Sequence, residues 1–278
     1  ILINNWFMAF YLVTIMIGTT YPIFTEVLKD TKISVGPPFY DTVIIPLVVP
    51  FLVIMALAPK AKWIKNNFKK SVSLTLIVFF SIIINFGIER YFNSYSVLTN
   101  LIIISSIFLI IYSIIDLVKS LIKKNSIDIP RIISHLGFGL LVFFIGINHS
   151  FSISNDFNIK VGEKKKFNNY SIDFQSLEIK ERKNYKAVVG IFNITNLKDL
   201  SQEFLTPEIR IYNQPETLTY EASIRSKISH DLYLTMSNIN RTEFYNIKFQ
   251  KKPFMVWIWL SAILISIGGF LRVFKNEN

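Results

Sequence analysis

The 278-residue sequence contains no cysteine and only three histidines, and both shortages limit its chemistry. Without thiols, the chain can form no disulfide, no cysteine metal site and no thiol nucleophile. It also has no glycine-rich phosphate loop and no His-Glu-x-x-His pair, the usual signatures of nucleotide and zinc-protease sites. His135 and His149 are 14 positions apart. On one helix they would lie about 21 Å apart, at about 1.5 Å per residue, so they cannot share one metal ion.

Acidic residues are fewer than basic ones, with 19 Asp and Glu against 30 Lys and Arg and a net charge of +11. In a soluble protein this excess would suggest nucleic acid as a partner. Here 51% of residues are hydrophobic, the mean hydropathy is +0.41, and the apolar residues occur in long blocks. We therefore expect a polytopic α-helical membrane protein that contacts the lipid bilayer and no nucleic acid.

The apolar blocks predict about six membrane spans, because each approaches the length that crosses a bilayer. The blocks are residues 1–18, 42–58, 72–88, 98–118, 131–150 and 253–271. Pro46 and Pro50 should kink the second span. Residues 19–41 contain Gly36-Pro37-Pro38 and mixed charges. We expect them to form an external loop with a short interfacial helix over Phe24–Lys29.

Lysines indicate which loops face inside. Two basic loops follow the second and fourth spans, and the first has no acidic residue among its lysines. They contain Lys60, Lys62, Lys65, Lys69 and Lys70, and then Lys119, Lys123, Lys124 and Arg131. Positive loops remain in the cytoplasm or mitochondrial matrix. This orientation places residues 151–252 on the outer side.

The predicted domains are residues 1–150 with five membrane helices, 151–252 as an external β-rich domain, and 253–278 with the final helix and an inner tail. Apolar and polar residues alternate over Ser171–Ile179, which predicts a half-buried strand. Similar runs occur at Tyr185–Ile194, Pro207–Tyr212, Asp231–Met236 and Glu243–Phe249. We expect a small sandwich or barrel, with Lys164-Lys165-Lys166 in a solvated turn.

His135 is the main candidate for a functional residue, because an ionisable side chain inside an apolar span is costly. It could instead be a neutral core histidine bonded to a neighbouring carbonyl group. Gly137 and Gly139 remove bulk beside it, so a partner helix or a flat cofactor could approach. The other two histidines have simpler interpretations. His149 is expected to be a surface residue, and His230 a structural residue of the β-rich domain.

Several stretches, in this order, are similar to one known family. They are Gly18-Thr-Thr-Tyr-Pro-Ile-Phe24, Lys32-Ile-Ser-Val-Gly-Pro-Pro-Phe-Tyr40, Ser134-His-Leu-Gly137, Pro215 to Arg225, Asp231-Leu-Tyr233 and Lys252-Pro-Phe-Met-Val-Trp-Ile-Trp-Leu260. The Gly-Pro-Pro stretch is the most specific. Together they resemble the C-terminal half of cytochrome c maturation protein F, the CcmF-type heme lyase subunit, a family that includes split mitochondrial forms.

The resemblance implies that His135 is one axial iron ligand of a membrane-bound heme b, opposite a histidine of the missing N-terminal half. A neutral imidazole is a normal ligand for heme iron. The family joins heme vinyl groups to apocytochrome cysteine thiols as thioethers. No catalytic residue is assigned to this chain, and we expect no activity without the N-terminal half, because the family's tryptophan-rich heme-handling motif is missing here.

The implied partners are the N-terminal half of the heme lyase, other cytochrome c maturation subunits and apocytochrome c. The implied location is the mitochondrial inner membrane with the β-rich domain in the intermembrane space, or alternatively the bacterial inner membrane with that domain in the periplasm. Two other functions stay open on the residues alone. The chain could be a heme-free structural subunit of a membrane complex, or a transporter half, although no inverted repeat of the proline-containing span is present.

Overall fold

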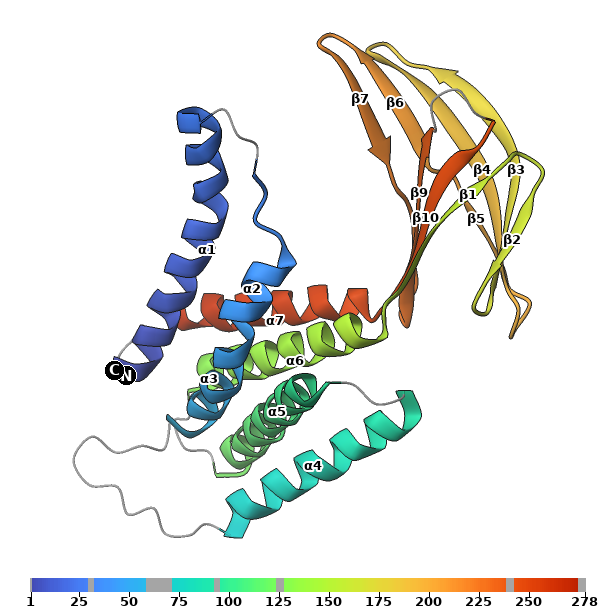
Figure 1. Ribbon diagram of the computed structural model, residues 1–278. Helices are drawn as coiled ribbons and strands as arrows, with labels where there is room; N and C mark the ends of the chain where they lie inside the picture. The colour runs from blue at the N-terminus through green and yellow to red at the C-terminus, as the bar shows by residue number, and fades with distance from the viewer. Residues whose placement is uncertain are drawn as a thin grey trace. The chain divides into compact units, whose positions relative to one another are not determined.

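The computed structural model describes residues 2–29, 33–58, 72–92, 96–123, 128–238 and 243–274. The chain divides into two compact units, a helical unit of Ile1–Ser150 with Ile258–Asn278 and a β unit of Phe151–Trp257 (Figure 1). The expected basic loop Lys60–Lys70 lies outside the described residues.

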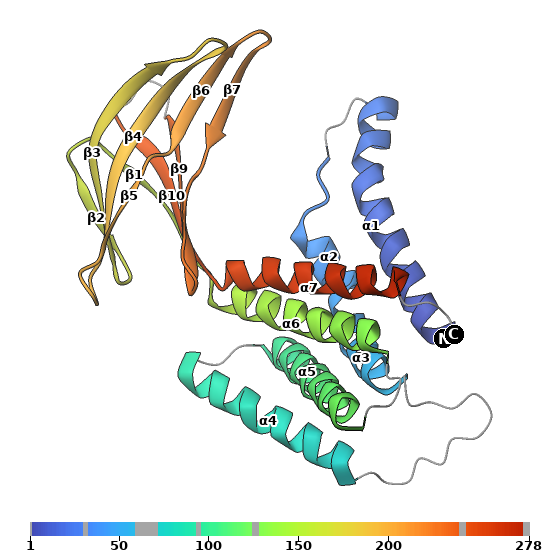
Figure 2. The ribbon, with the colours of Figure 1, turned by 180° about the vertical axis from the view of Figure 1, so that it is seen from behind.

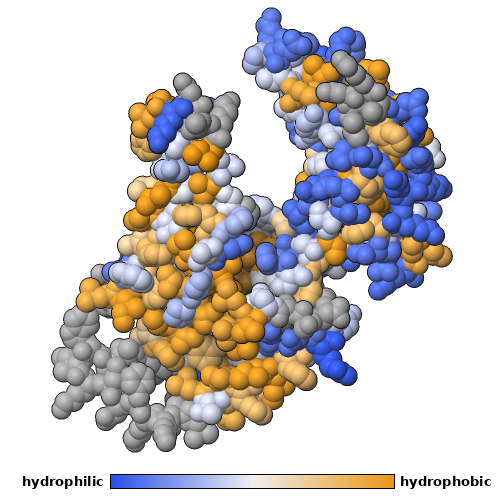
Figure 3. Space-filling view, in the orientation of Figure 1, coloured by the Kyte–Doolittle hydropathy of each residue, from blue (hydrophilic) through white to orange (hydrophobic). Residues whose placement is uncertain are grey.

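The described helices are predominantly apolar, and five of them are long and apolar enough to cross a membrane. The seven helices are α1 Leu2–Lys29, α2 Pro37–Val43, α3 Ile45–Leu57, α4 Val72–Phe92, α5 Val97–Lys123, α6 Ile129–Phe151 and α7 Met255–Val273. Hydrophobic residues dominate the visible surface of the helical unit, whereas the β unit is mostly hydrophilic (Figure 3). The chain is thus a polytopic α-helical membrane protein with one small β-rich domain.

Two expectations for the N-terminal region are wrong. The first helix does not end near Gly18 but continues through Pro22 to Lys29. The hydroxyl groups of Thr19 and Thr20 donate hydrogen bonds to the carbonyl groups of Ile15 and Met16, at 2.8 and 2.7 Å. These are local side-chain bonds within the helix. A membrane helix tolerates a proline such as Pro22 where its surroundings compensate for the lost N–H.

The expected second span is divided. The break falls at Ile44, between α2 of 7 residues and α3 of 13 residues. Pro46 lies in the first turn of α3, where its missing N–H has no intrahelical acceptor to lose. A helix of 13 residues is shorter than a usual bilayer crossing. Five span-length helices are therefore present in the described part, and not six.

The centre of the helical unit is α5, which lies between α4 and α6 in both ribbon views (Figures 1 and 2). One buried cluster joins α3, α4 and α5, and Phe138 and Val142 of α6 pack against it. Its fully packed members are Leu52, Ala56, Ile77, Phe108, Leu109 and Tyr112. The amide group of Asn85 on α4 donates a 2.6 Å hydrogen bond to Asn100 on α5. Polar bonds of this kind help membrane helices associate.

The β unit is a sandwich of two antiparallel sheets. One sheet has the order β1-β10-β9-β8, and the other has the order β2-β3-β4-β6-β7 with β5 also paired to β4. The strands are β1 Ile153–Ile159, β2 Lys164–Phe167, β3 Tyr170–Glu181, β4 Tyr185–Asn196, β5 Gln202–Leu205, β6 Glu208–Asn213, β7 Glu216–Glu221, β8 Ser223–Ser226, β9 His230–Asn238 and β10 Tyr245–Pro253. Phe174, Phe192 and Phe249 are fully buried between the sheets.

Strands occur at all five runs that the period-two pattern indicated, as β3, β4, β6, β9 and β10. The lysine run Lys164-Lys165-Lys166 is exposed as expected, but it forms strand β2 and not a turn. Lys164 pairs with Asp173 on β3, and the two side chains form a 3.0 Å ion pair. Backbone pairing with β3 gives this polar segment its extended conformation, which its own sequence does not indicate.

Candidate functional site

His135 lies in the first half of α6 and is half-buried. Residues three and four positions apart lie on the same face of a helix. His135 therefore shares a face with Phe138 and Gly139, and this face is turned toward α3 and α5. Phe138 meets Phe51 of α3 edge to face, with the ring centroids 5.6 Å apart. The imidazole is thus attached to a firmly packed helix while part of its surface stays accessible.

The first contact that fixes α6 is with α7, and small residues on both helices allow it. A Cβ added at Gly137 would stand 2.9 Å from the backbone nitrogen of Ile265. A Cβ added at Gly268 of α7 would stand 2.7 Å from the backbone nitrogen of Ser134. At one end of the pair, Arg272 of α7 forms a 3.0 Å ion pair with Asp128, just before α6. The residues on either side of His135 are therefore in close contact with α7.

The second contact is with α5. A Cβ added at Gly139 would stand 3.0 Å from the side chain of Ile110, and one at Gly146 would stand 3.4 Å from Ile103. Both contacts lie seven positions apart on their own helix, so the two helices run antiparallel and stay close over two turns. The sequence allowed either a partner helix or a flat cofactor beside Gly137 and Gly139. In the structure a helix lies beside each glycine, α7 beside Gly137 and α5 beside Gly139.

Three charged residues lie close enough to His135 to act on it electrostatically, namely Arg131, Asp116 and Asp128. Arg131 is one turn before His135 on the same helix, and Asp116 belongs to α5. One cation and two carboxylates therefore act on the imidazole from this end of the helix pair, and Asp128 is itself paired with Arg272. They are the groups through which the chain can set the electrostatic potential at His135.

The other two histidines do not join this site. His149 is exposed near the end of α6. His230 is half-buried in the β unit, where its Nδ1 lies 2.9 Å from the hydroxyl group of Ser229. Burial lowers the pKa of His230, and the charges of Lys251 and Lys227 lower it further. Within the described residues, no group of three or more His, Asp or Glu side chains could hold a metal ion.

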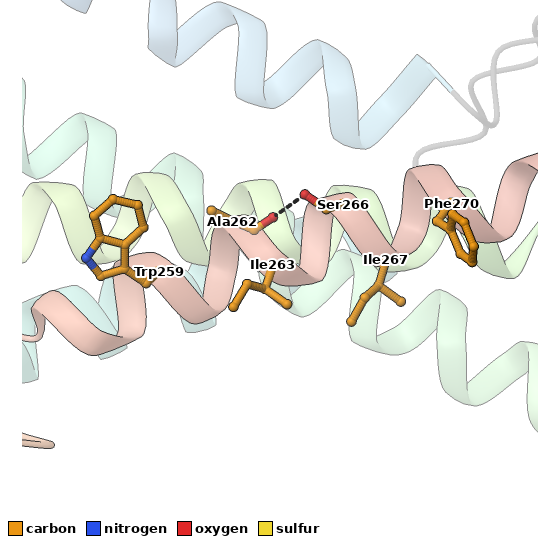
Figure 4. A pocket seen from close by; sticks show the side chains of 6 residues that line it. All are labelled: Trp259, Ala262, Ile263, Ser266, Ile267 and Phe270. Atoms are coloured by element: carbon orange, nitrogen blue, oxygen red, sulfur yellow. Dashed lines mark hydrogen bonds between the residues drawn. The ribbon is translucent and has the colours of Figure 1, made fainter.

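A shallow groove with a volume of about 470 Å³ lies along α7. Figure 4 shows its lining side chains, all from this one helix. They are Trp259, Ala262, Ile263, Ser266, Ile267 and Phe270. The hydroxyl group of Ser266 donates its hydrogen to the carbonyl group of Ala262 at 3.0 Å, so it offers a ligand in the apolar groove an acceptor but no donor. The groove suits an acyl chain or another apolar helix, and it offers no iron ligand.

The α7 half of this arrangement, in which Ser261 and Gly268 complement Gly137 and Ser134, was not predicted from the sequence. The signal was the seven-residue spacing of Ser261 and Gly268, two of several small residues in this span. Such spacing marks a close helix contact in membranes. The spacing alone does not say which helix is the partner.

Comparison with known proteins gives one consistent family. Residues 150–253 match the family described as CcmF C-terminal beta-sandwich. Over 100% of its length the chain is 23% identical to "Cytochrome c-type biogenesis protein CcmF" of Haemophilus influenzae, covering 44% of that protein. Over 99% of its length it is 23% identical to the protein of the same name from Escherichia coli, covering 43% of it.

A solved structure, "Cytochrome c Heme Lyase CcmF", has the same fold, with a TM-score of 0.72 at 15% sequence identity. The match covers 96% of this chain and 44% of that one. The chain thus spans less than half the length of these relatives. The matches relate this chain, along nearly all of its length, to the C-terminal half of the CcmF proteins.

Proposed function

We propose that the chain is the C-terminal part of a cytochrome c heme lyase and contributes to covalent attachment of heme to apocytochrome c. The observation that carries this proposal is the similarity to CcmF proteins along the whole chain, through both the helical unit and the β unit. Because the chain corresponds to about 44% of such a protein, activity requires the N-terminal half. That half is the first partner we assign, followed by other maturation subunits and apocytochrome c.

His135 is proposed as one axial ligand of a membrane-bound heme b. The fit rests on three features of this helix. The imidazole is partly accessible, its helix is apolar, and contacts with α5 and α7 hold that helix on two sides. Iron needs only one ligand from this chain if a histidine of the N-terminal half supplies the other. A heme bound there would supply one-electron chemistry.

The chain's own residues would then orient the ligand and set its surroundings. Helices α5 and α7 fix the direction of α6 and hence the position of the His135 ring. Arg131, Asp116 and Asp128 place charge beside it. We assign no acid–base step to these groups. In this proposal they position the His135 ligand and set the redox potential of the heme iron.

The proposed location is the mitochondrial inner membrane with the β unit in the intermembrane space, and the alternative is a bacterial inner membrane with the β unit in the periplasm. The support for this orientation is the lysine-rich loop 60–70, which has no acidic residue. The span-length helices and the named bacterial relatives support an inner-membrane protein.

The test is the visible spectrum of the chain purified with its N-terminal half. His135→Ala should remove the low-spin b-type bands and stop cytochrome c maturation, while insertion into the membrane continues. His149→Ala is the matched control, because it removes an exposed histidine from the same helix and should leave the spectrum unchanged. Added imidazole should restore part of the spectrum to the His135→Ala complex, since it replaces the lost ligand.

The opposite result is equally clear. If the His135→Ala complex keeps the full low-spin spectrum, another residue ligates the iron. If the complex of unaltered halves contains no heme band at all, the chain is a heme-free structural subunit.

A further inference from the structure

One end of the β sandwich carries both connections to the apolar helices. Strand β1 begins two residues after α6 ends, and β10 ends two residues before α7 begins. These strand ends are neighbours, because Ile153 pairs with Lys251. The root of α7 is tied to the same end, since the indole nitrogen of Trp257 donates a 3.0 Å hydrogen bond to the carbonyl group of Ile228.

Two turns of the sandwich lie at this same end, one from each sheet. The β8–β9 turn, residues 227–229, lies beside the end of β10, because His230 pairs with Pro253. The β4–β5 turn, residues 197–201, is joined to it through Glu203 at the start of β5. The carboxylate of Glu203 forms a 2.6 Å ion pair with Lys227. We call these two turns together the basal rim.

The basal rim presents apolar side chains at its tips. Ile228 is 74% exposed and Leu200 is 72% exposed. Leu200 also has a φ of 57°, in the left-handed region that favours glycine or asparagine. A leucine in that conformation is strained, so an exposed apolar side chain is kept there against the local backbone preference.

Lysines lie near these tips, together with the exposed carboxylate of Asp199, and lysine side chains suit contact with lipid headgroups. Lys198 lies between Leu197 and Leu200 and is exposed. Lys251 extends over the ring of Tyr170, with its Nζ 5.7 Å from the ring centroid. Apolar tips enter the headgroup layer, while lysine stems lie along it and keep their ammonium groups near phosphate.

We propose that the basal rim rests in the headgroup layer of the bilayer, with Leu200 and Ile228 as its two membrane anchors. Lipid is the occupant we assign, because both chain connections at this end lead directly into span-length apolar helices. Trp257 at the same end has the amphipathic character of residues in the aromatic belt of a membrane. The rim would hold the β unit against the membrane surface by contacts additional to its two helix connections.

The absence of cysteine makes this proposal easy to test. The single variants Leu200→Cys and Ile228→Cys would be made in the full chain and labelled with a nitroxide. Each labelled protein would be reconstituted into bilayers of phosphatidylethanolamine and phosphatidylglycerol. Ile179→Cys is the matched control, because Ile179 is 75% exposed but lies near the opposite end of the sandwich. Collisions of each label with oxygen, which concentrates in lipid, are compared with collisions with a polar nickel chelate.

Labels at positions 200 and 228 should collide more with oxygen than with the chelate, and the label at 179 should show the reverse. As a second readout, a charged maleimide should react several-fold more slowly with unlabelled thiols at 200 and 228 than at 179. Equal access of the chelate to all three positions would overturn the proposal. Protection of 200 and 228 from both oxygen and the chelate would also overturn it, because a protein partner would then cover the rim.

Discussion

Gly18 lies against the phenol ring of Tyr40, so closely that a Cβ at position 18 would stand 2.9 Å from the Tyr40 Cζ. The contact joins the two N-terminal stretches that carried the family resemblance, the Gly-Thr-Thr-Tyr-Pro stretch in α1 and the Gly-Pro-Pro-Phe-Tyr stretch that opens α2. The backbone of Phe39 donates a 3.1 Å hydrogen bond to Gly36, which closes the turn before Tyr40. The stretch that begins α2 is thereby packed onto α1.

Replacing Gly18 with Ala should therefore destabilise the helical unit by about 1–3 kcal/mol, the usual cost of overpacking a close contact. Gly87→Ala is the control, because a Cβ at position 87 would meet nothing within 4 Å. Resistance to unfolding in mixed detergent micelles measures the difference.

The same contact can be isolated with a double-mutant cycle. If the cost comes from the ring, Gly18→Ala should cost little in a Tyr40→Ala background, because the obstructing group is gone. An unchanged cost in that background would show that Gly18 matters for another reason.

Two neighbouring glycines of α7, Gly268 and Gly269, separate the effect of a helix contact from the effect of helix propensity. Gly268→Ala should weaken the α6–α7 contact, because its Cβ would collide with Ser134 and the carbonyl oxygen of Pro130. Gly269→Ala should be neutral or slightly stabilising, because nothing lies within 4 Å of a Cβ there and Ala favours a helix over Gly by roughly 1 kcal/mol.

The readout for this pair is heme retention together with thermal stability in detergent. Gly268→Ala should lower both, since it displaces the helix that carries His135. Equal behaviour of the two variants would mean that α6 and α7 do not depend on this close approach.

The sequence predicted those features that depend on local pattern. Blocks of apolar residues indicated the long helices, and period-two alternation indicated the central strands. It missed the continuation of α1 through Pro22 to Lys29, because the mixed charges of residues 19–41 indicated a loop. A proline inside a helix is tolerated only where the surroundings compensate for its missing N–H. It also missed short polar strands such as β2, whose conformation is set by pairing with β3.

The candidate site shows the same limit. His135 could be selected from the sequence because a histidine is conspicuous in an apolar span. The sequence could not say that Gly137 faces α7 while Gly139 faces α5, since that depends on tertiary packing. Nor could it pair Asp128 with Arg272, which lie 144 positions apart.

The pH dependence of the β unit should have two separable parts. Burial, with Lys251 and Lys227, lowers the pKa of His230 below its ordinary value of 6.5, although Asp231 and Asp199 oppose the shift. The folded state thus binds fewer protons than the unfolded state, so this contribution is present above pH 6.5 and is lost as the pH falls below it. His230→Gln should remove this part of the acid sensitivity.

Glu203 should act at lower pH. A hydrogen bond from Lys227, followed by the charges of Lys227 and Arg225, lowers the pKa of Glu203 below its ordinary value of 4.5. Its contribution is present above pH 4.5 and is lost as the pH falls through the lowered value. Hydrogen exchange of β9 amides in the full chain, followed against pH, distinguishes the two steps. If the His230→Gln variant and the unaltered chain had the same exchange profile above pH 5, the step assigned to His230 would be contradicted.

Charges beside His135 provide a test of the proposed heme that does not remove its ligand. A positive charge near iron favours the reduced state, because that state carries one positive charge less. Arg131→Gln should therefore lower the midpoint potential of the bound heme, and Asp116→Asn should raise it. Each change is on the order of 1 kcal/mol, or roughly 40 mV, for a charge several ångströms from the iron.

Redox titration of the visible bands in the complex measures both midpoint potentials, with His149→Ala as the variant expected to leave the potential unchanged. Opposite shifts of the two variants would support iron beside this end of α6. Shifts of the same sign would indicate a structural disturbance, and no shift in either would place the iron away from His135.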